Sequence, residues 1–215
     1  MEKIFSKRVS LILVFVFVSF PLFSQVKVAC VGNSITEGWN GHPSYVPMLQ
    51  RLLGSEYIVQ NDGKSGATML KNGNYSYWGT GVIAKVLAFH PDIVTIMLGT
   101  NDTKPQNWDK HGSEFKADYE SLIDTLSSSS LKPKIFLVLP SPVWDNPYRI
   151  RNEIIELEIP LIKEIAKERD LPVVDANTPL LSFRKYFNDG VHPDIAGADT
   201  LASVISRSIL SRMRN

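Results

Sequence analysis

The stretch VKVACVGNSITEGWN, residues 26–40, runs from an apolar segment through a glycine into small polar residues. Val26–Val31 has the length and composition of a buried β-strand that ends at Gly32. Four more short runs rich in Val and Ile end in the same way, at Gly, Asn, Pro or Asp: Tyr57–Gln60, Asp92–Leu98, Lys134–Leu139 and Pro172–Val174. The sequence therefore predicts five buried strands.

Segments with helical spacing lie between and after these runs: Tyr45–Leu53, Thr80–Phe89, Glu114–Ser127, Asn152–Arg169 and Ile195–Met213. Alternation of strands and helices predicts an α/β fold, with a parallel sheet covered by helices on both faces. A chain of 215 residues with 44% hydrophobic content is long enough for one sizeable core and short for two. We expect residues 25–215 to form a single domain.

Residues 1–24 have the layout of a secretory signal peptide. Three basic residues precede an apolar run at 9–23, and the small or polar residues Ser24 and Gln25 follow it. Cleavage near Ser24 would give an exported protein, periplasmic or secreted, without a stable membrane partner. An uncleaved membrane anchor is the alternative, because Leu22 is a poor fit to the small residue wanted at the third position before the cut.

Charge and cysteine content exclude several classes of protein. The chain has 23 basic and 22 acidic residues without a long run of either sign, which does not favour a nucleic-acid partner. Its only cysteine, Cys30, excludes a disulfide framework and a thiolate metal cluster. We expect Cys30 to be a small buried apolar residue. Lipidation of Cys30 is the alternative, although Lys27 stands where an apolar residue would be wanted.

Four polar blocks fall in the layer where a parallel sheet binds ligands, beyond the carboxyl ends of the strands. They are GNS at 32–34, NDGKSGAT at 61–68, GTND at 99–102 and DGVHP at 189–193. Each block alone is explained by a helix cap or a turn. Together they supply a combination of hydroxyl, imidazole, carboxylate and hydrogen-bond donors that caps and turns do not require.

That combination is what a serine nucleophile needs for ester cleavage. Ser34 offers the hydroxyl, His192 a base, and Asp189 a carboxylate that orients the base. The backbone N–H groups of Ser34 and Gly66 and the side-chain amide of Asn101 are candidate donors to the oxyanion.

Three histidines remain: His42, His90 and His111. The sequence gives them no comparable set of hydroxyl, carboxylate and donor groups, and we expect them to be structural or solvated. No two histidines have helical ligand spacing, so a metal site is not expected.

The four blocks, in this order, resemble those of the SGNH, or GDSL-like, hydrolases. The resemblance implies a three-layer α/β/α fold of flavodoxin-like order, and ester hydrolysis through an acyl-enzyme without a cofactor. It assigns Ser34 as nucleophile, Gly66 and Asn101 as completing the oxyanion hole, and Asp189 and His192 as completing the triad. Asn33 replaces the aspartate that usually precedes the nucleophile, a position that is not catalytic in the family. No GxSxG elbow is present, which argues against the ordinary α/β-hydrolase arrangement.

Five aromatic residues fall in the loops that should surround the site, where flat rings suit sugars or simply pack the loops: Trp39, Tyr77, Trp78, Trp108 and Trp144. The amino-acid sequences of the blocks are similar to those of exported bacterial proteins grouped with sialate O-acetylesterases and other carbohydrate esterases. The expected substrate is therefore a small-molecule or glycan ester, with acetyl as the acyl group. The alternatives are a lysophospholipase or thioesterase of the same fold, and a catalytically silent glycan-binding module.

Overall fold

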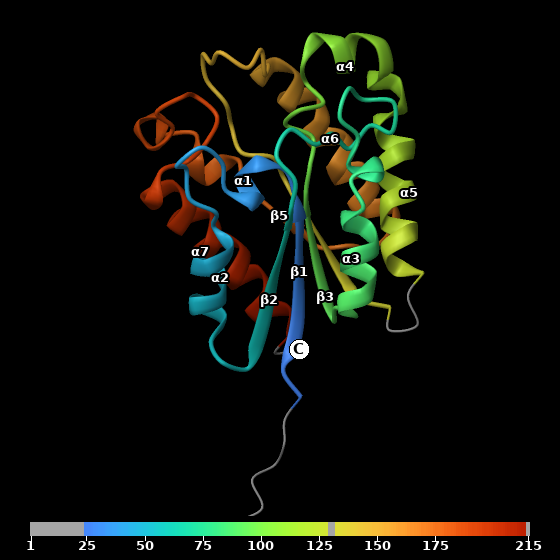
Figure 1. Cartoon of the computed structure of the whole chain (residues 1–215), viewed down its shortest axis with the longest axis vertical. Coiled ribbons are helices and arrows are strands. Elements are labelled where there is room, and N and C mark those ends of the chain that lie inside the picture. The colour runs from blue at the N-terminus through green and yellow to red at the C-terminus, as the bar shows by residue number, and fades with distance from the viewer. Residues whose placement is uncertain (1–23, 129–131, 214–215) are drawn as a thin grey trace, which may run out of the picture.

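The computed structural model describes residues 24–128 and 132–213. Five parallel strands form one sheet in the order β2-β1-β3-β4-β5 (Figure 1). Their bounds are Val26–Gly32 (β1), Tyr57–Gly63 (β2), Ile93–Met97 (β3), Lys134–Val138 (β4) and Val173–Val174 (β5). This is the flavodoxin-like doubly wound order, and it confirms the predicted fold class.

Helices cover both faces of the sheet (Figure 1). Helices α2 (Val46–Leu53) and α7 (Ile195–Met213) pack on one face, and α3 (Val82–Phe89), α5 (Phe115–Ser127) and α6 (Asn152–Glu168) pack on the other. The sheet separates two hydrophobic clusters because neighbouring residues of a strand point to opposite faces.

Strand β1 shows this alternation directly. Val28 and Cys30 belong to the cluster under α2 and α7, whereas Ala29 and Val31 belong to the other cluster. Cys30 is fully buried, as predicted, and burial raises the pKa of its thiol to about 12.

The structure adds short helices that periodicity did not reveal. These are α1 (Ser34–Glu37) and α4 (Pro105–His111), with single 3₁₀ turns at Tyr77–Gly79, Gly112–Glu114, Thr178–Leu180 and Arg184–Tyr186. Elements of three to seven residues are too short to show a repeating apolar face. Strand β2 is also longer than predicted, because pairing with β1 continues through polar Asn61 and Asp62 to Gly63.

The predicted signal peptide lies outside the described residues, apart from Ser24. Within the described part of the chain, no helix combines the length and apolar character needed to cross a membrane.

The carboxyl ends of β1 and β2 approach α1 closely. Gly32 pairs with Gly63 across the two strands, and a Cβ atom on Gly63 would lie 2.2 Å from the backbone nitrogen of Glu37. A glycine is therefore required where the second strand passes under the turn that carries Ser34.

We expect Gly63→Ala to lower the free energy of unfolding by about 1–3 kcal/mol, because the added methyl group would push α1 away from the sheet. Chemical denaturation measures this change. Gly79→Ala is the matched control, because a Cβ atom there would meet nothing within 4 Å. Equal stability of the two variants would contradict the close packing of β2 against α1.

Candidate active site

Ser34 is the first residue of α1, directly beyond the carboxyl end of β1. The Oδ1 atom of Asn33 caps this helix by accepting the N–H of Ile35 at 3.0 Å. The cap needs only one side-chain oxygen, which asparagine and aspartate both provide. Asn33 therefore fits the position where the resembled motif has aspartate.

A chain of hydrogen bonds joins Ser34 to the loop before α7. Ser34 Oγ lies 2.8 Å from His192 Nε2, and His192 Nδ1 lies 2.7 Å from Asp189 Oδ2. The other carboxylate oxygen, Oδ1, accepts the backbone N–H groups of Val191 and His192 at 2.9 and 2.8 Å. The tight turn thus holds the carboxylate beside the imidazole, and the structure brings together the three residues predicted as a triad.

Burial and hydrogen bonding set the charges of this chain. Burial lowers the pKa of His192 below its usual value, and Asp189 opposes this shift only in part. Nearby His42 and Lys104 lower the pKa of His192 further. Burial would raise the pKa of Asp189, but the N–H groups of His192 and Val191 outweigh it and hold that pKa far below its usual range. A neutral imidazole beside an ionised carboxylate is the state that accepts a proton from a hydroxyl.

A tight turn brings two further rings to His192. Trp39 and His42 form an antiparallel bridge around Asn40 and Gly41, which both have positive φ, at 48° and 84°. Trp39 stacks on His192 with ring centroids 5.0 Å apart, and His42 Nε2 lies 3.5 Å from Asp189 Oδ2. The expectation that His42 has no catalytic groups near it is therefore wrong. The Asn-Gly pair is the hairpin signal that could have indicated this placement.

Tyr148 is a site residue that the sequence analysis missed. Its hydroxyl donates a hydrogen bond of 3.0 Å to Asp189 Oδ2, and its ring meets His192 edge to face. The side chain of Asn146 holds this loop by accepting the N–H groups of Tyr148 and Ile150 and donating to the carbonyl of Ile150. Only a contact with Asp189, 41 residues away in sequence, gives this tyrosine a role.

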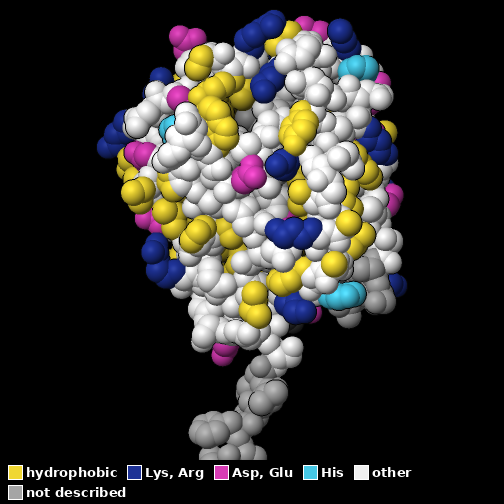
Figure 2. Space-filling view, in the orientation of Figure 1, with side chains coloured by type: hydrophobic (Ala, Val, Ile, Leu, Met, Phe, Trp, Pro, Cys, Tyr) yellow, Lys and Arg dark blue, Asp and Glu magenta, His cyan; other side chains and the backbone are white. Residues whose placement is uncertain are grey.

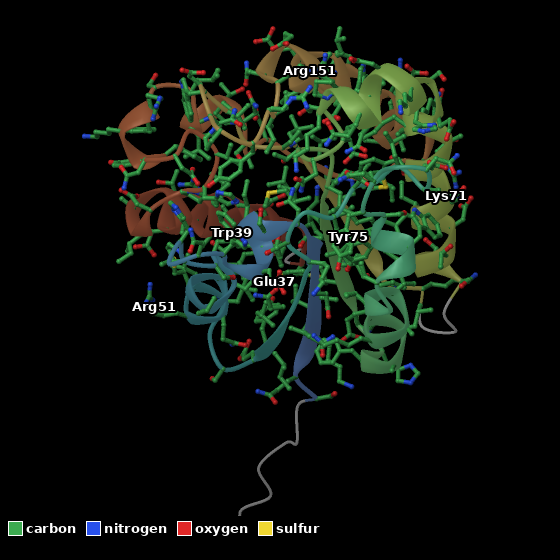
Figure 3. All side chains as sticks on the ribbon, turned by 45° about the horizontal axis from the view of Figure 1, so that its top comes forward. Glu37, Trp39, Arg51, Lys71, Tyr75 and Arg151 are labelled. Carbon is green, nitrogen blue, oxygen red and sulfur yellow. The ribbon has the colours of Figure 1, made fainter. Side chains whose placement is uncertain are left out.

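A cavity of about 190 Å³ opens onto Ser34 and His192. Gly66 and Asn101, the predicted oxyanion donors, line it, together with Trp39 and Tyr148. In Figure 3, the labelled residues Trp39, Tyr75 and Arg151 lie around the carboxyl end of the sheet.

The loop of Asn101 is fixed from several sides. Its Nδ2 donates to the carbonyl of Ala67 at 3.1 Å, and its carbonyl accepts Nδ2 of Asn107 at 2.8 Å. Next to it, the carboxylate of Asp102 accepts the backbone N–H groups of Met69 and Leu70. The second and third polar blocks are thus tied together beside Ser34, although the oxyanion role of Gly66 and Asn101 stays a prediction.

Comparison with known proteins gives a family match for most of the chain. Residues 30–199 match the model of the GDSL-like Lipase/Acylhydrolase family. The chain belongs to this family. The predicted resemblance is confirmed.

Two relatives are acetylxylan esterases. The one from Xylanibacter ruminicola is 36% identical over an alignment 212 residues long, and the alignment covers 88% of this chain and 44% of the relative. The chain thus spans less than half the length of that protein. The one from Geobacillus stearothermophilus is 29% identical and aligns over 86% of this chain and 94% of the relative.

Solved structures share the fold. A lipase/acylhydrolase from Enterococcus faecalis superposes with a TM-score of 0.72 at 24% identity, over 87% of this chain and 97% of that one. The M. smegmatis aryl esterase superposes with a TM-score of 0.70 at 20% identity, over 86% and 99% of the two chains.

Two of the aromatic residues predicted to contact substrate lie elsewhere in this family member. Tyr77 is fully buried, and its hydroxyl donates to the carbonyl of Asp62 at 2.7 Å. Trp78 donates its Nε1–H to the carbonyl of Met69 and packs against the core under α3 and α5. Neither residue lines the cavity. Tyr77 is fully buried, so its predicted contact with substrate is wrong, whereas the predicted role of the partly buried Trp78 stays a prediction. A position in a loop does not reveal which way a side chain points.

The other predicted aromatic residues divide in the same way. Trp108 packs against Phe115 in the core. Trp39 lines the cavity, and Trp144 lines a second hollow of about 530 Å³ that shares Ile150 with it. A role in substrate binding stays a prediction for these last two.

His42, Asp189 and His192 could also be considered as metal ligands, because their candidate ligand atoms lie within 4.8 Å of one another. Spacing in the sequence could not suggest this set. The hydrogen bond between His192 Nδ1 and Asp189 Oδ2 already occupies two of these atoms. A metal ion would have to break that bond.

Proposed function

We propose that this protein is a serine esterase that removes O-acetyl groups from a carbohydrate. The observation that carries the proposal is the hydrogen-bonded chain of Ser34, His192 and Asp189 at the mouth of a cavity. Family membership supports ester hydrolysis, and the two acetylxylan esterase relatives favour acetylated xylan as the substrate. O-acetylated sialic acid is the second candidate substrate.

The size of the cavity supports a small acyl group. Pockets for larger ligands commonly measure about 300–1,000 Å³, whereas the space over Ser34 is about 190 Å³. A lysophospholipase or long-chain thioesterase would need an extended apolar groove at this point. The residues around the cavity instead mix aromatic rings with polar side chains.

In the proposed mechanism, His192 Nε2 accepts the proton of Ser34 Oγ as that oxygen attacks the ester carbonyl. Negative charge develops on the carbonyl oxygen, which the N–H groups of Ser34 and Gly66 and the amide of Asn101 stabilise. The protonated His192 then donates its proton to the departing sugar hydroxyl. Water attacks the acyl-enzyme by the same route and releases acetate.

Asp189 holds His192 in the productive tautomer. Its Oδ2 accepts the Nδ1–H of the imidazole, so Nε2 is left with a lone pair toward Ser34. Tyr148 donates to the same oxygen and limits its movement.

We expect Ser34→Ala to lower kcat/KM for an aryl acetate by about 10⁴–10⁶-fold and to abolish labelling by a fluorophosphonate probe, because the nucleophile is lost. Aryl esters from acetyl to decanoyl should show the highest kcat/KM for the wild type at acetyl. Ser121→Ala, on the exposed side of α5, is the matched control. Equal labelling of the wild type and Ser34→Ala would refute the assignment of the nucleophile.

We expect the acid limb of kcat/KM to have an apparent pKa below 6.5, the usual value for histidine. The active form carries neutral His192, and burial lowers the pKa of that imidazole, so the active form persists to lower pH. Measuring kcat/KM for an aryl acetate from about pH 4 to pH 9 gives this value. An apparent pKa above that of free histidine would contradict the burial of the base.

Export is part of the proposed function, and the signal-peptide layout of residues 1–24 supports it. We expect mass spectrometry of the protein from its native host to find an N-terminus near Gln25. An intact Met1 on membrane-bound protein would support the anchor alternative.

A further inference from the structure

Lys104 brings a positive charge into the cavity around Ser34. Among the residues that line this cavity, Lys104 is the one charged lysine or arginine, and no carboxylate lines it. Lys104 is half-buried and lies at the start of α4, two residues beyond Asp102. Any group that a substrate places in the cavity therefore meets a cation without a competing anion in the lining.

The ammonium group of Lys104 has no acceptor within the described parts of the chain. Burial lowers its pKa, and the charge of Asp102 opposes this shift, with no hydrogen bond contributing. An ammonium that loses water without gaining a partner has this behaviour. An anion bound in the cavity would stabilise the charged ammonium that burial destabilises.

Several cations elsewhere on the protein form ion pairs. Lys116 contacts the carboxylates of Glu164 and Glu168, and Arg151 contacts Asp109 at 2.6 Å. Lys104 forms no such ion pair within the described residues, and it differs from other unpaired cations because it lines the cavity over Ser34. Figure 2 shows basic and acidic side chains intermixed over the visible face, so the surface charge of that face does not by itself favour anions.

The neighbouring hollow does not select for charge. It shares Ile150 with the cavity and is lined by residues of both signs, Arg149 and Arg151 with Asp145 and Glu153. A neutral or acidic glycan chain can continue there. Selection for an anionic group must then come from Lys104.

We propose that Lys104 binds the carboxylate of a uronic acid in the glycan whose acetyl ester Ser34 cleaves. This inference rests on the proposed function and narrows its substrate class to acidic glycans. A charge-assisted hydrogen bond between an ammonium and a carboxylate is among the stronger contacts available to a sugar. The same charge lies near His192, so the bound carboxylate would also reduce the effect of Lys104 on the imidazole.

The test compares two acetylated xylotrioses that differ in one group. One carries a glucuronosyl side residue, and the other is the same compound with that carboxyl group reduced to hydroxymethyl. We expect the wild type to favour the acidic compound by about tenfold in kcat/KM, and the ratio to fall to about one in Lys104→Met. Lys104→Arg should retain a preference, and 1 M salt should weaken it in the wild type.

Using the ratio cancels effects of Lys104→Met on His192 that both substrates share. Lys110→Met, at the exposed end of the same helix, is the control and should keep the wild-type ratio. A ratio near one in the wild type, or an equal loss on both substrates in Lys104→Met, overturns the assignment of a carboxylate. Such a result with an inactive Ser34→Ala variant leaves the esterase proposal intact, whereas an active Ser34→Ala variant overturns the esterase proposal itself.

Discussion

The hydrogen bond of 2.8 Å between Ser34 Oγ and His192 Nε2 joins residues 158 positions apart. It forms only when the loop before α7 lies beside the carboxyl end of β1. Apolar packing sets that position, because Leu201 and Ile205 of α7 share a core cluster with Val28 of β1 and with α2. The geometry of the polar chain thus depends on the non-directional burial of apolar side chains.

The polar chain is fixed in place before any substrate arrives. Both oxygens of Asp189 are engaged, Oδ1 by backbone N–H groups and Oδ2 by His192 and Tyr148. Trp39 stacks on the imidazole from the tight turn that follows α1. Groups held in this way need little reorganisation when charge develops, which is the condition for electrostatic stabilisation of a transition state.

The sequence predicted the features that follow from regular repeats. Strand periodicity located the sheet, and the rule that ligands bind at the carboxyl ends of strands brought Ser34 and His192 into one layer. Side-chain direction in loops has no such repeat, so Tyr77 was wrongly predicted to contact substrate and Tyr148 was missed. Long-range contacts between irregular segments decide both, and a single sequence does not display them.

A buried acid under the site shows the same dependence on tertiary structure. Glu158 of α6 is fully buried, and neither carboxyl oxygen has a partner among the described side chains and backbone. Burial and the charge of Asp102 raise its pKa well above the usual value, which favours the neutral acid. A Cβ atom on Gly99, whose φ is 125°, would lie 2.5 Å from Glu158 Oε2, so the loop that carries Asn101 rests on this acid. A buried glutamate without a partner is unfavourable for the packing of α6. Glu158 thus departs from local rules next to the loop of a candidate oxyanion donor, and such departures are expected at functional sites.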